Sequence, residues 1–165
     1  MLIIIGALSR LVPHPANVTA IGALAVFSGS KYGKIKGLFI VIGSMICGDI
    51  VLGLHSVMWA TYGSLAISVL IARHILQKQS VVRIAGVTLI SSTIFYIITN
   101  FAVWVIPGSM YPKTITGLMD SYFMALPFFR NSLVGDFFYT GVLFGSWEII
   151  GIVQKTILRS LRYSK

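Results

Sequence analysis

The sequence has few charged residues and very few acidic ones. Asp, Glu, Lys and Arg make up 10% of its 165 residues, whereas 56% are hydrophobic, and the mean hydropathy is +0.90. Because a soluble domain carries roughly a quarter charged residues, this composition predicts an all-α integral membrane protein. Cys47 is the single cysteine, so a disulfide framework and a paired-thiol metal site are excluded. Its apolar surroundings favour a packed thiol.

Several catalytic motifs are also absent. The sequence contains no Gly-x-x-x-x-Gly-Lys-Ser/Thr phosphate loop, no His-Glu-x-x-His and no Gly-x-Ser-x-Gly, and its four acids form no evident dyad, so we expect no enzyme activity. His14 and His55 lie in separate turns without an acid or thiol at ligand spacing, so neither a metal nor a cofactor is expected. The net charge of +9 reflects basic membrane loops rather than nucleic-acid binding.

Six apolar segments are present, in a single domain spanning residues 1–165. A spanning helix needs about 20 apolar residues, and the predicted segments are residues 2–12, 18–30, 37–54, 57–76, 83–106 and 133–157. The first is too short to cross alone. Pro112 and Pro127 bracket residues 113–126, which are predicted to form a short amphipathic helix at the membrane interface.

Basic residues predict the orientation. Ten of the 13 lie on one set of connections: Lys31, Lys34, Lys36, Arg73, Lys78, Arg83, Lys155, Arg159, Arg162 and Lys165. The positive-inside rule therefore puts both termini in the cytoplasm. The opposite, outer side receives Arg10, Lys113 and Arg130, together with the connections at residues 10–17, at His55 and at residues 107–132.

Residues 10–17, Arg-Leu-Val-Pro-His-Pro-Ala-Asn, form a polar break between two apolar runs. Pro13 and Pro15 donate no backbone hydrogen bond and push the preceding residues out of helical conformation. In lipid, such a backbone needs partners in protein or in a water-lined cavity. The break is therefore either a turn at the membrane surface or the lip of a binding site.

Two carboxyl groups lie within apolar segments. Asp49 should face the inside of the helix bundle, because an ionisable residue at that depth is costly. Asp136 follows the start of the last segment, where the helix dipole favours an acid, and a ligand contact is the equal alternative. Either acid could pair with Arg10 or Arg130.

The outer part of the sequence mixes aromatic and polar groups. Asn100 and Trp104 lie four residues apart on one helix face, and Asn100 either bonds a neighbouring helix or contacts a ligand. The segment at residues 110–131 resembles small-molecule sites in being mostly apolar with sparse polar anchors, although an interfacial helix has the same composition. Proton or sodium coupling through Asp49 and Asp136 is a further alternative.

Small residues recur four apart in the second segment, at Ala16 and Ala20 and again at Ala25 and Gly29. Such spacing lets helices approach closely in lipid. Internal packing of the bundle accounts for it most simply, and docking to another membrane subunit is the alternative.

The ordered set of motifs along the chain resembles a bacterial inner-membrane family that is similar to the substrate-binding S components of energy-coupling factor (ECF) transporters. These motifs lie at residues 10–17, 25–29, 48–49, 99–104, 111–114, 117–118, 126–131 and 135–136. The resemblance implies about six helices and outer loops that cap a site for a vitamin-like micronutrient. It also implies a membrane coupling subunit and cytoplasmic ATPases as partners, although the expected Ala-x-x-x-Ala of the first helix is missing here.

We therefore predict an S-component-like uptake protein that binds a small anionic or amphipathic solute at its outer face. The alternative is a structural or assembly subunit without a ligand of its own. The candidate solute-binding residues are Arg10, His14, Asn17, Asp49, Asn100, Trp104, Tyr111, Lys113, Phe128, Arg130, Asn131 and Asp136.

Overall fold

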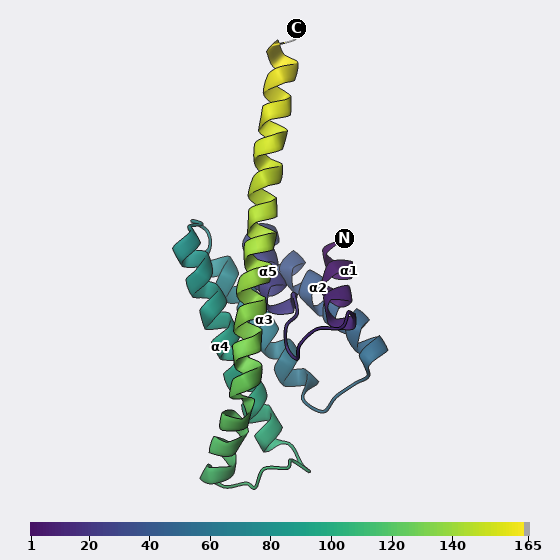
Figure 1. Ribbon diagram of the computed structural model, residues 1–165, viewed down its shortest axis with the longest axis vertical. Coiled ribbons are helices and arrows are strands. Elements are labelled where there is room, and N and C mark those ends of the chain that lie inside the picture. Colours follow the sequence, from purple (N-terminus) through teal and green to yellow (C-terminus); the bar gives the residue numbers. More distant parts are fainter. Residues whose placement is uncertain (164–165) are drawn as a thin grey trace.

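The computed structural model describes residues 1–163, which are helical or irregular and contain no strand. The helices are α1 (Leu2–Leu11), α2 (Ile21–Leu52), α3 (Met58–Ile75), α4 (Val81–Val105) and α5 (Ile115–Tyr163). Figure 1 shows α5 running the full height of the molecule beside the other four helices. The all-helical prediction is confirmed for this part of the chain.

Helix α2 folds back on itself at Gly33. This residue has φ 80° and ψ −176°, outside the helical region, a conformation that glycine adopts without steric cost. The Ser28 hydroxyl donates a hydrogen bond to the Gly37 carbonyl oxygen at 3.3 Å, across the turn. The predicted segments 18–30 and 37–54 thus correspond to the two halves of α2, which lie against each other.

The core forms where this folded helix meets its neighbours. One buried cluster joins both halves of α2 to α3 and contains Ile21, Leu24, Ala25, Val41, Met45, Leu65 and Val69. A second joins α2 to α3, α4 and α5 and contains Val26, Phe27, Ala72, Leu76, Val87 and Phe144. Both clusters depend on α2, which therefore organises the bundle.

Three helices are long and apolar enough to cross a membrane: Ile21–Leu52, Val81–Val105 and Ile115–Arg159. Helix α1, with 10 residues, is too short, as its sequence predicts. Helix α3 matches the predicted segment 57–76 closely but does not belong to the three. These apolar helices fit a multi-pass membrane protein.

Helix α5 differs from the prediction. Two elements separated at Pro127 were expected, an interfacial helix at residues 113–126 and a span at 133–157, but one continuous helix of 49 residues contains Pro127. Helix α4 supports α5 on both sides of the proline: the Tyr96 hydroxyl donates to the Tyr122 carbonyl oxygen at 2.7 Å, and its ring lies 4.5 Å from that of Phe129. These contacts hold α5 against α4 on both sides of the proline, which itself removes the backbone bond to the Phe123 carbonyl oxygen.

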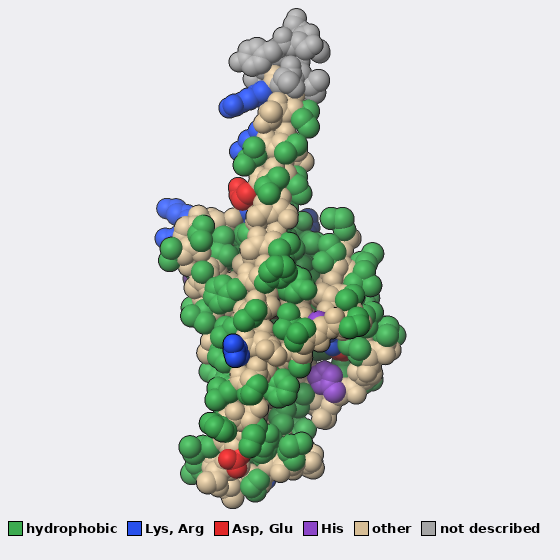
Figure 2. Space-filling model, viewed as in Figure 1, with side chains coloured by type: hydrophobic (Ala, Val, Ile, Leu, Met, Phe, Trp, Pro, Cys, Tyr) green, Lys and Arg blue, Asp and Glu red, His purple; other side chains and the backbone are tan. Residues whose placement is uncertain are grey.

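Apolar side chains are also spread over the whole height of the face shown in Figure 2. Leu54, Ile50 and Phe39 are 79%, 75% and 74% exposed, values that would be unfavourable over so large an area in water. At 1.5 Å per residue, α5 is about 74 Å long, more than twice the roughly 30 Å of a bilayer core. Phe144 and Glu148 still contact other helices, and the part of α5 after them extends beyond the bundle (Figure 1).

Candidate functional site

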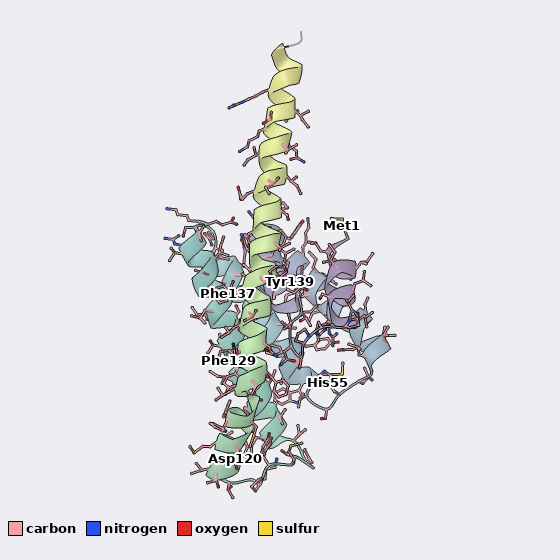
Figure 3. All side chains as sticks on the ribbon, viewed as in Figure 1. Met1, His55, Asp120, Phe129, Phe137 and Tyr139 are labelled. Atoms are coloured by element: carbon pink, nitrogen blue, oxygen red, sulfur yellow. The ribbon has the colours of Figure 1, made fainter. Side chains whose placement is uncertain are left out.

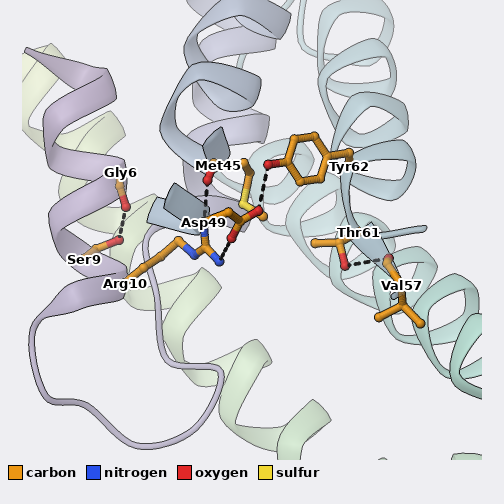
Figure 4. Close-up of polar contacts among 8 residues, drawn as sticks. All are labelled: Gly6, Ser9, Arg10, Met45, Asp49, Val57, Thr61 and Tyr62. Atoms are coloured by element: carbon orange, nitrogen blue, oxygen red, sulfur yellow. Dashed lines mark hydrogen bonds and ion pairs between the residues drawn. The ribbon is translucent and has the colours of Figure 1, made fainter. Parts of the chain in front are cut away.

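Three helices meet at a buried ion pair between Arg10 and Asp49. The Arg10 guanidinium donates from Nη2 to Asp49 Oδ1 at 2.5 Å and from Nη1 to the Met45 carbonyl oxygen at 3.0 Å. The Tyr62 hydroxyl of α3 donates to Asp49 Oδ2 at 2.7 Å. The side chain of Asp49 is 2% exposed, so both its oxygens have partners inside the protein (Figure 4). Of the pairings that the sequence left open, the structure contains the one between Arg10 and Asp49, and Asp49 faces the inside of the bundle as expected.

The local sequence allows this approach. A Cβ atom on Gly48 would lie 2.5 Å from Arg10 Nη1, so a side chain at this turn of α2 would displace the guanidinium from its present position. Ser9, beside Arg10, donates to the Gly6 carbonyl oxygen at 2.8 Å and accepts from the Ala20 backbone N–H at 3.1 Å. The start of α2 is thereby tied to the end of α1.

The connection from α1 to α2 contains the polar break and lies against α5. Asn17 has a φ of 64°, in the left-handed region that asparagine tolerates better than most residues. Asn131 of α5 donates from Nδ2 to the Ala16 carbonyl oxygen at 3.1 Å. The ring of His14 places Nδ1 2.8 Å from the Pro15 carbonyl oxygen. The Asn131 contact therefore holds the connection against α5 shortly before α2 begins.

Asp136 lies at the N-terminus of α2. Its carboxyl group accepts hydrogen bonds from the Ser92 hydroxyl, at 2.6 Å from Oδ2, and from the backbone N–H of Ala23. A Cβ atom on Gly22 would lie 2.2 Å from Asp136 Oδ1. Ala20, the residue at the helix N-cap, has no side-chain cap, so Asp136 supplies from α5 the acceptor and the negative charge that a helix N-terminus favours.

A cavity of about 320 Å³ lies between Arg10 on one side and Asp136 on the other. It is lined by Arg10, His14, Asn17, Thr19, Ile21, Gly22, Met45, Leu52, Thr61, Leu65, Ser68, Ser91, Ser92, Phe95, Ser132 and Asp136. Asn17 and Leu52 are exposed, whereas Ser68, Ser92 and Asp136 are buried. The cavity therefore has a rim at the α1–α2 connection and a polar floor inside the bundle.

Hydroxyl groups make up much of this lining, and sequence reasoning missed them. They belong to Thr19, Thr61, Ser68, Ser91, Ser92 and Ser132. The Ser91 hydroxyl is buried and, among the described residues, is the buried side-chain polar atom without a hydrogen-bond partner. The adjacent pair Ser91-Ser92 within an apolar helix is the signal that could have indicated a polar site.

The structure brings four predicted binding residues to the cavity: Arg10, His14, Asn17 and Asp136. Asp49 and Asn131 do not line the cavity. Asp49 pairs with Arg10, which lines it, and Asn131 bonds Ala16, which is next to the lining residue Asn17. The remaining candidates lie outside the lining.

Most of these outlying candidates belong to the α4–α5 end. Asn100 donates to the Tyr96 carbonyl oxygen of its own helix at 2.8 Å. The Trp104 ring N–H donates to the Pro112 carbonyl oxygen at 2.9 Å, and the Lys113 ammonium donates to the Trp104 and Ile106 carbonyl oxygens. These bonds close the α4–α5 connection.

The last candidates also lie at this end or on the surface. The Tyr111 backbone N–H donates to the Ser109 hydroxyl at 3.2 Å, and Phe128 and Arg130 are exposed on α5. Figure 3 shows Asp120 near the start of α5 and His55 in the α2–α3 connection, on separate parts of the molecule.

The small-residue pattern packs inside the protein. Ala20 and Ala25 are buried, and a Cβ atom on Gly29 would lie 2.3 Å from the Val69 carbonyl oxygen of α3. Of the four predicted docking residues only Ala16 is exposed. Close packing of α2 against α3 thus accounts for the pattern without a second subunit.

Cys47 differs from its prediction, because it is exposed on the outward side of α2 rather than packed in the core. Residues 46 and 50, on the same side of the helix, are exposed as well. Within the part of the chain that the structure describes, no group of three His, Cys, Asp or Glu side chains could hold a metal ion.

Comparison with known proteins gives a family but no characterised relative. No curated protein and no solved structure matches the chain. One family model, described as a family of unknown function (DUF6580), matches residues 1–159. The chain therefore belongs to this family.

Proposed function

We propose that this protein is the solute-binding subunit of a membrane uptake system, similar to the S components of ECF transporters, and that it binds a small vitamin-like micronutrient. The observation that carries the proposal is the cavity with a polar floor inside a bundle of apolar helices. Its volume of about 320 Å³ is at the lower end of the range for small-molecule sites. A buried hydroxyl without a hydrogen-bond partner destabilises a bundle that has only a structural role. In a binding site, such a hydroxyl is available to bond the ligand.

The proposed arrangement has about six membrane segments in a bacterial cytoplasmic membrane, of which α1 is too short to cross alone. The reversal at Gly33 divides α2 into two segments, so that α1, the halves of α2, and α3 to α5 alternate in direction. Lys31, Lys34 and Lys36 then lie at the same side as the α3–α4 connection and the C-terminus, which is the cytoplasmic side by the positive-inside rule. The rim of the cavity opens toward the outer side.

Uptake against a concentration gradient requires an energy source. The sequence has no phosphate loop, and we propose a membrane coupling subunit with cytoplasmic ATPases as the partners. In this arrangement the present chain binds the solute and its partners hydrolyse ATP. It is proposed to be a transport protein without catalytic activity of its own.

The test is a thermal-unfolding screen of the purified full-length protein in neutral detergent against vitamins and their precursors. A ligand at 100 times its Kd stabilises the native state by about 2.7 kcal/mol. The variant Ser132→Trp fills the rim of the cavity, and Val134→Trp is a matched control because Val134 is 61% exposed on the same helix. Stabilisation that is lost only in Ser132→Trp supports the proposal. No stabilisation by any compound contradicts it.

A second candidate function is a structural or assembly subunit. The part of α5 after residue 148 favours it, because Ile149, Ile152 and Leu158 are 63%, 63% and 67% exposed and this part extends beyond the bundle (Figure 1). A partner protein could cover this helix. The assembly function would be favoured by two results together. A stoichiometric partner would co-purify with the wild type but not with a chain truncated after residue 148, and no compound of the thermal-unfolding screen would stabilise the protein.

A further inference from the structure

The two charged ends of the cavity are not equivalent. At one end, Arg10 is already paired with Asp49 at 2.5 Å. At the other end, Asp136 is 9% exposed, and it takes part in neither of the ion pairs found among the described residues, Arg10–Asp49 and Lys31–Glu148. When these three groups near the cavity are counted together, the positive charge of Arg10 is balanced by Asp49, and the charge of Asp136 is left over.

Asp136 also keeps hydrogen-bonding capacity. A carboxylate has about four lone-pair sites, and the hydroxyl of Ser92 and the backbone N–H of Ala23 occupy two of them. A buried carboxylate without a cation is costly. A positively charged group in the cavity would reduce this cost, whereas an anion there would add to it.

Ser91 points to a ligand at the same floor. Two other hydroxyls of α4 near Ser91 have partners inside the protein: Thr88 donates to the Ile84 carbonyl oxygen at 2.9 Å, and Ser92 donates to Asp136 Oδ2 at 2.6 Å. Ser91 is 4% exposed, lines the cavity and has no such partner. A buried hydroxyl of this kind is expected to bind a group that enters the cavity.

Part of the remaining wall is apolar. Ile21 and Leu65 are 4% and 2% exposed, and with Phe95 and Met45 they line the cavity between its charged ends. A fully hydrated inorganic ion gains nothing from contact with apolar side chains, whereas the body of an organic molecule packs against them.

We propose that the cavity binds a small organic cation with an apolar or aromatic body, such as an amine, an amidine or a protonated nitrogen heterocycle. Its positive nitrogen contacts Asp136, a second polar group hydrogen-bonds to Ser91, and its body packs against Leu65 and Phe95. This inference rests on the proposed function of the cavity as a solute site. It replaces the anionic solute that the exposed basic residues of the outer segments suggest, because those residues lie outside the lining or are paired.

The experiment compares three probes of nearly the same shape and different charge: benzamidine (cation), benzamide (neutral) and benzoate (anion). Binding to the full-length protein in neutral detergent is measured by ligand-observed NMR and by thermal unfolding, at fixed ionic strength. We expect benzamidine to bind about tenfold more tightly than benzamide. A tenfold difference in Kd corresponds to about 1.4 kcal/mol, which is less than a hydrogen bond to a charged group contributes. Benzoate should bind more weakly than either.

Variants locate the site. Asp136→Asn keeps an oxygen that can cap α2 and should reduce the preference for benzamidine about tenfold, whereas Asp120→Asn, on an exposed residue of the same helix, should leave it unchanged. If Asp136→Asn fails to fold, the order of the three probes on the wild type still tests the inference. Equal or tighter binding of benzoate overturns it.

The remaining outcomes separate this inference from the proposed function. If none of the three probes binds but a neutral or anionic vitamin stabilises the protein, the cation is wrong and the solute site stands. If no compound of either set binds, both fail. A further outcome is that NaCl stabilises the protein more than KCl does, that this difference depends on Asp136, and that benzamidine has no effect. This result would overturn the proposed organic cation in favour of a site for an inorganic ion.

Discussion

The ion pair between Arg10 and Asp49 predicts a strong coupling between two residues of different helices. Breaking a buried pair by removing one partner typically costs about 3–5 kcal/mol, because it leaves the other charge uncompensated. Asp49→Asn leaves Arg10, whose side chain is 14% exposed, with the Met45 carbonyl oxygen alone. Arg10→Met leaves Asp49, 2% exposed, with Tyr62 alone. The second variant should therefore lose more stability than the first.

The double variant Arg10→Met/Asp49→Asn separates the pair from its surroundings. It contains no uncompensated charge at this site, and its asparagine can still accept the hydrogen bond of the Tyr62 hydroxyl. We expect it to lose about 2 kcal/mol, well below the sum of the two single variants. The free energy of unfolding is measured in neutral detergent micelles by titration with SDS, followed by circular dichroism and without added solute.

Two controls accompany this cycle. Tyr62→Phe removes one hydrogen bond to a charged group and should cost about 1.5–3 kcal/mol. Lys34→Met removes an exposed cation near the turn of α2 and should change stability by about 0.5 kcal/mol at most. If the double variant loses the sum of the single losses to within about 0.5 kcal/mol, Arg10 and Asp49 do not interact, and the reasoning about this junction is refuted.

Three further substitutions test the packing, a helix end and the cavity. Gly29→Ala puts a methyl group 2.3 Å from the Val69 carbonyl oxygen and should lower the free energy of unfolding by about 1–3 kcal/mol. Its control, Gly63→Ala on α3, meets nothing within 4 Å and should be neutral or stabilising. Equal effects of the two variants in the same SDS titration would contradict this packing. Lys113→Gln removes the ammonium from the last carbonyl oxygens of α4, and a loss of about 0.3–1 kcal/mol is expected; no loss at low salt would argue against the cap. Ser91→Ala removes a buried hydroxyl without a partner and should raise the free energy of unfolding by about 1 kcal/mol while weakening benzamidine binding; lower stability would mean that the hydroxyl has a partner in solution.

The cavity could be predicted only in part. The polar break at residues 10–17 indicated the rim, since two prolines and a fixed charge between apolar runs are typical of a membrane-surface turn or of a binding site. Arg10, His14, Asn17 and Asp136 do line the cavity. The serine hydroxyls of α3 and α4 were not predicted, because a serine in a membrane helix usually bonds the carbonyl oxygen four residues earlier. Whether it does so depends on the neighbouring helix.

The outer segment shows the opposite error. Asn100, Trp104 and Lys113 have the residue types of a binding site, but their hydrogen bonds are all made within α4 and the α4–α5 connection. Sequence spacing places such residues on one helix face but does not tell whether that face meets a cavity, a loop or lipid.

The sequence by itself determined the all-helical class, the apolar surface and the inward direction of Asp49, because these follow from composition and from the cost of an unpaired charge among apolar groups. Only the tertiary structure decided that α5 continues through Pro127, since the contacts of Tyr96 on both sides of the proline come from another helix. The same holds for the cavity floor. Asp136 belongs to the last helix of the chain, and its position at the N-terminus of α2 depends on the packing of α5 against Gly22, which no local pattern encodes.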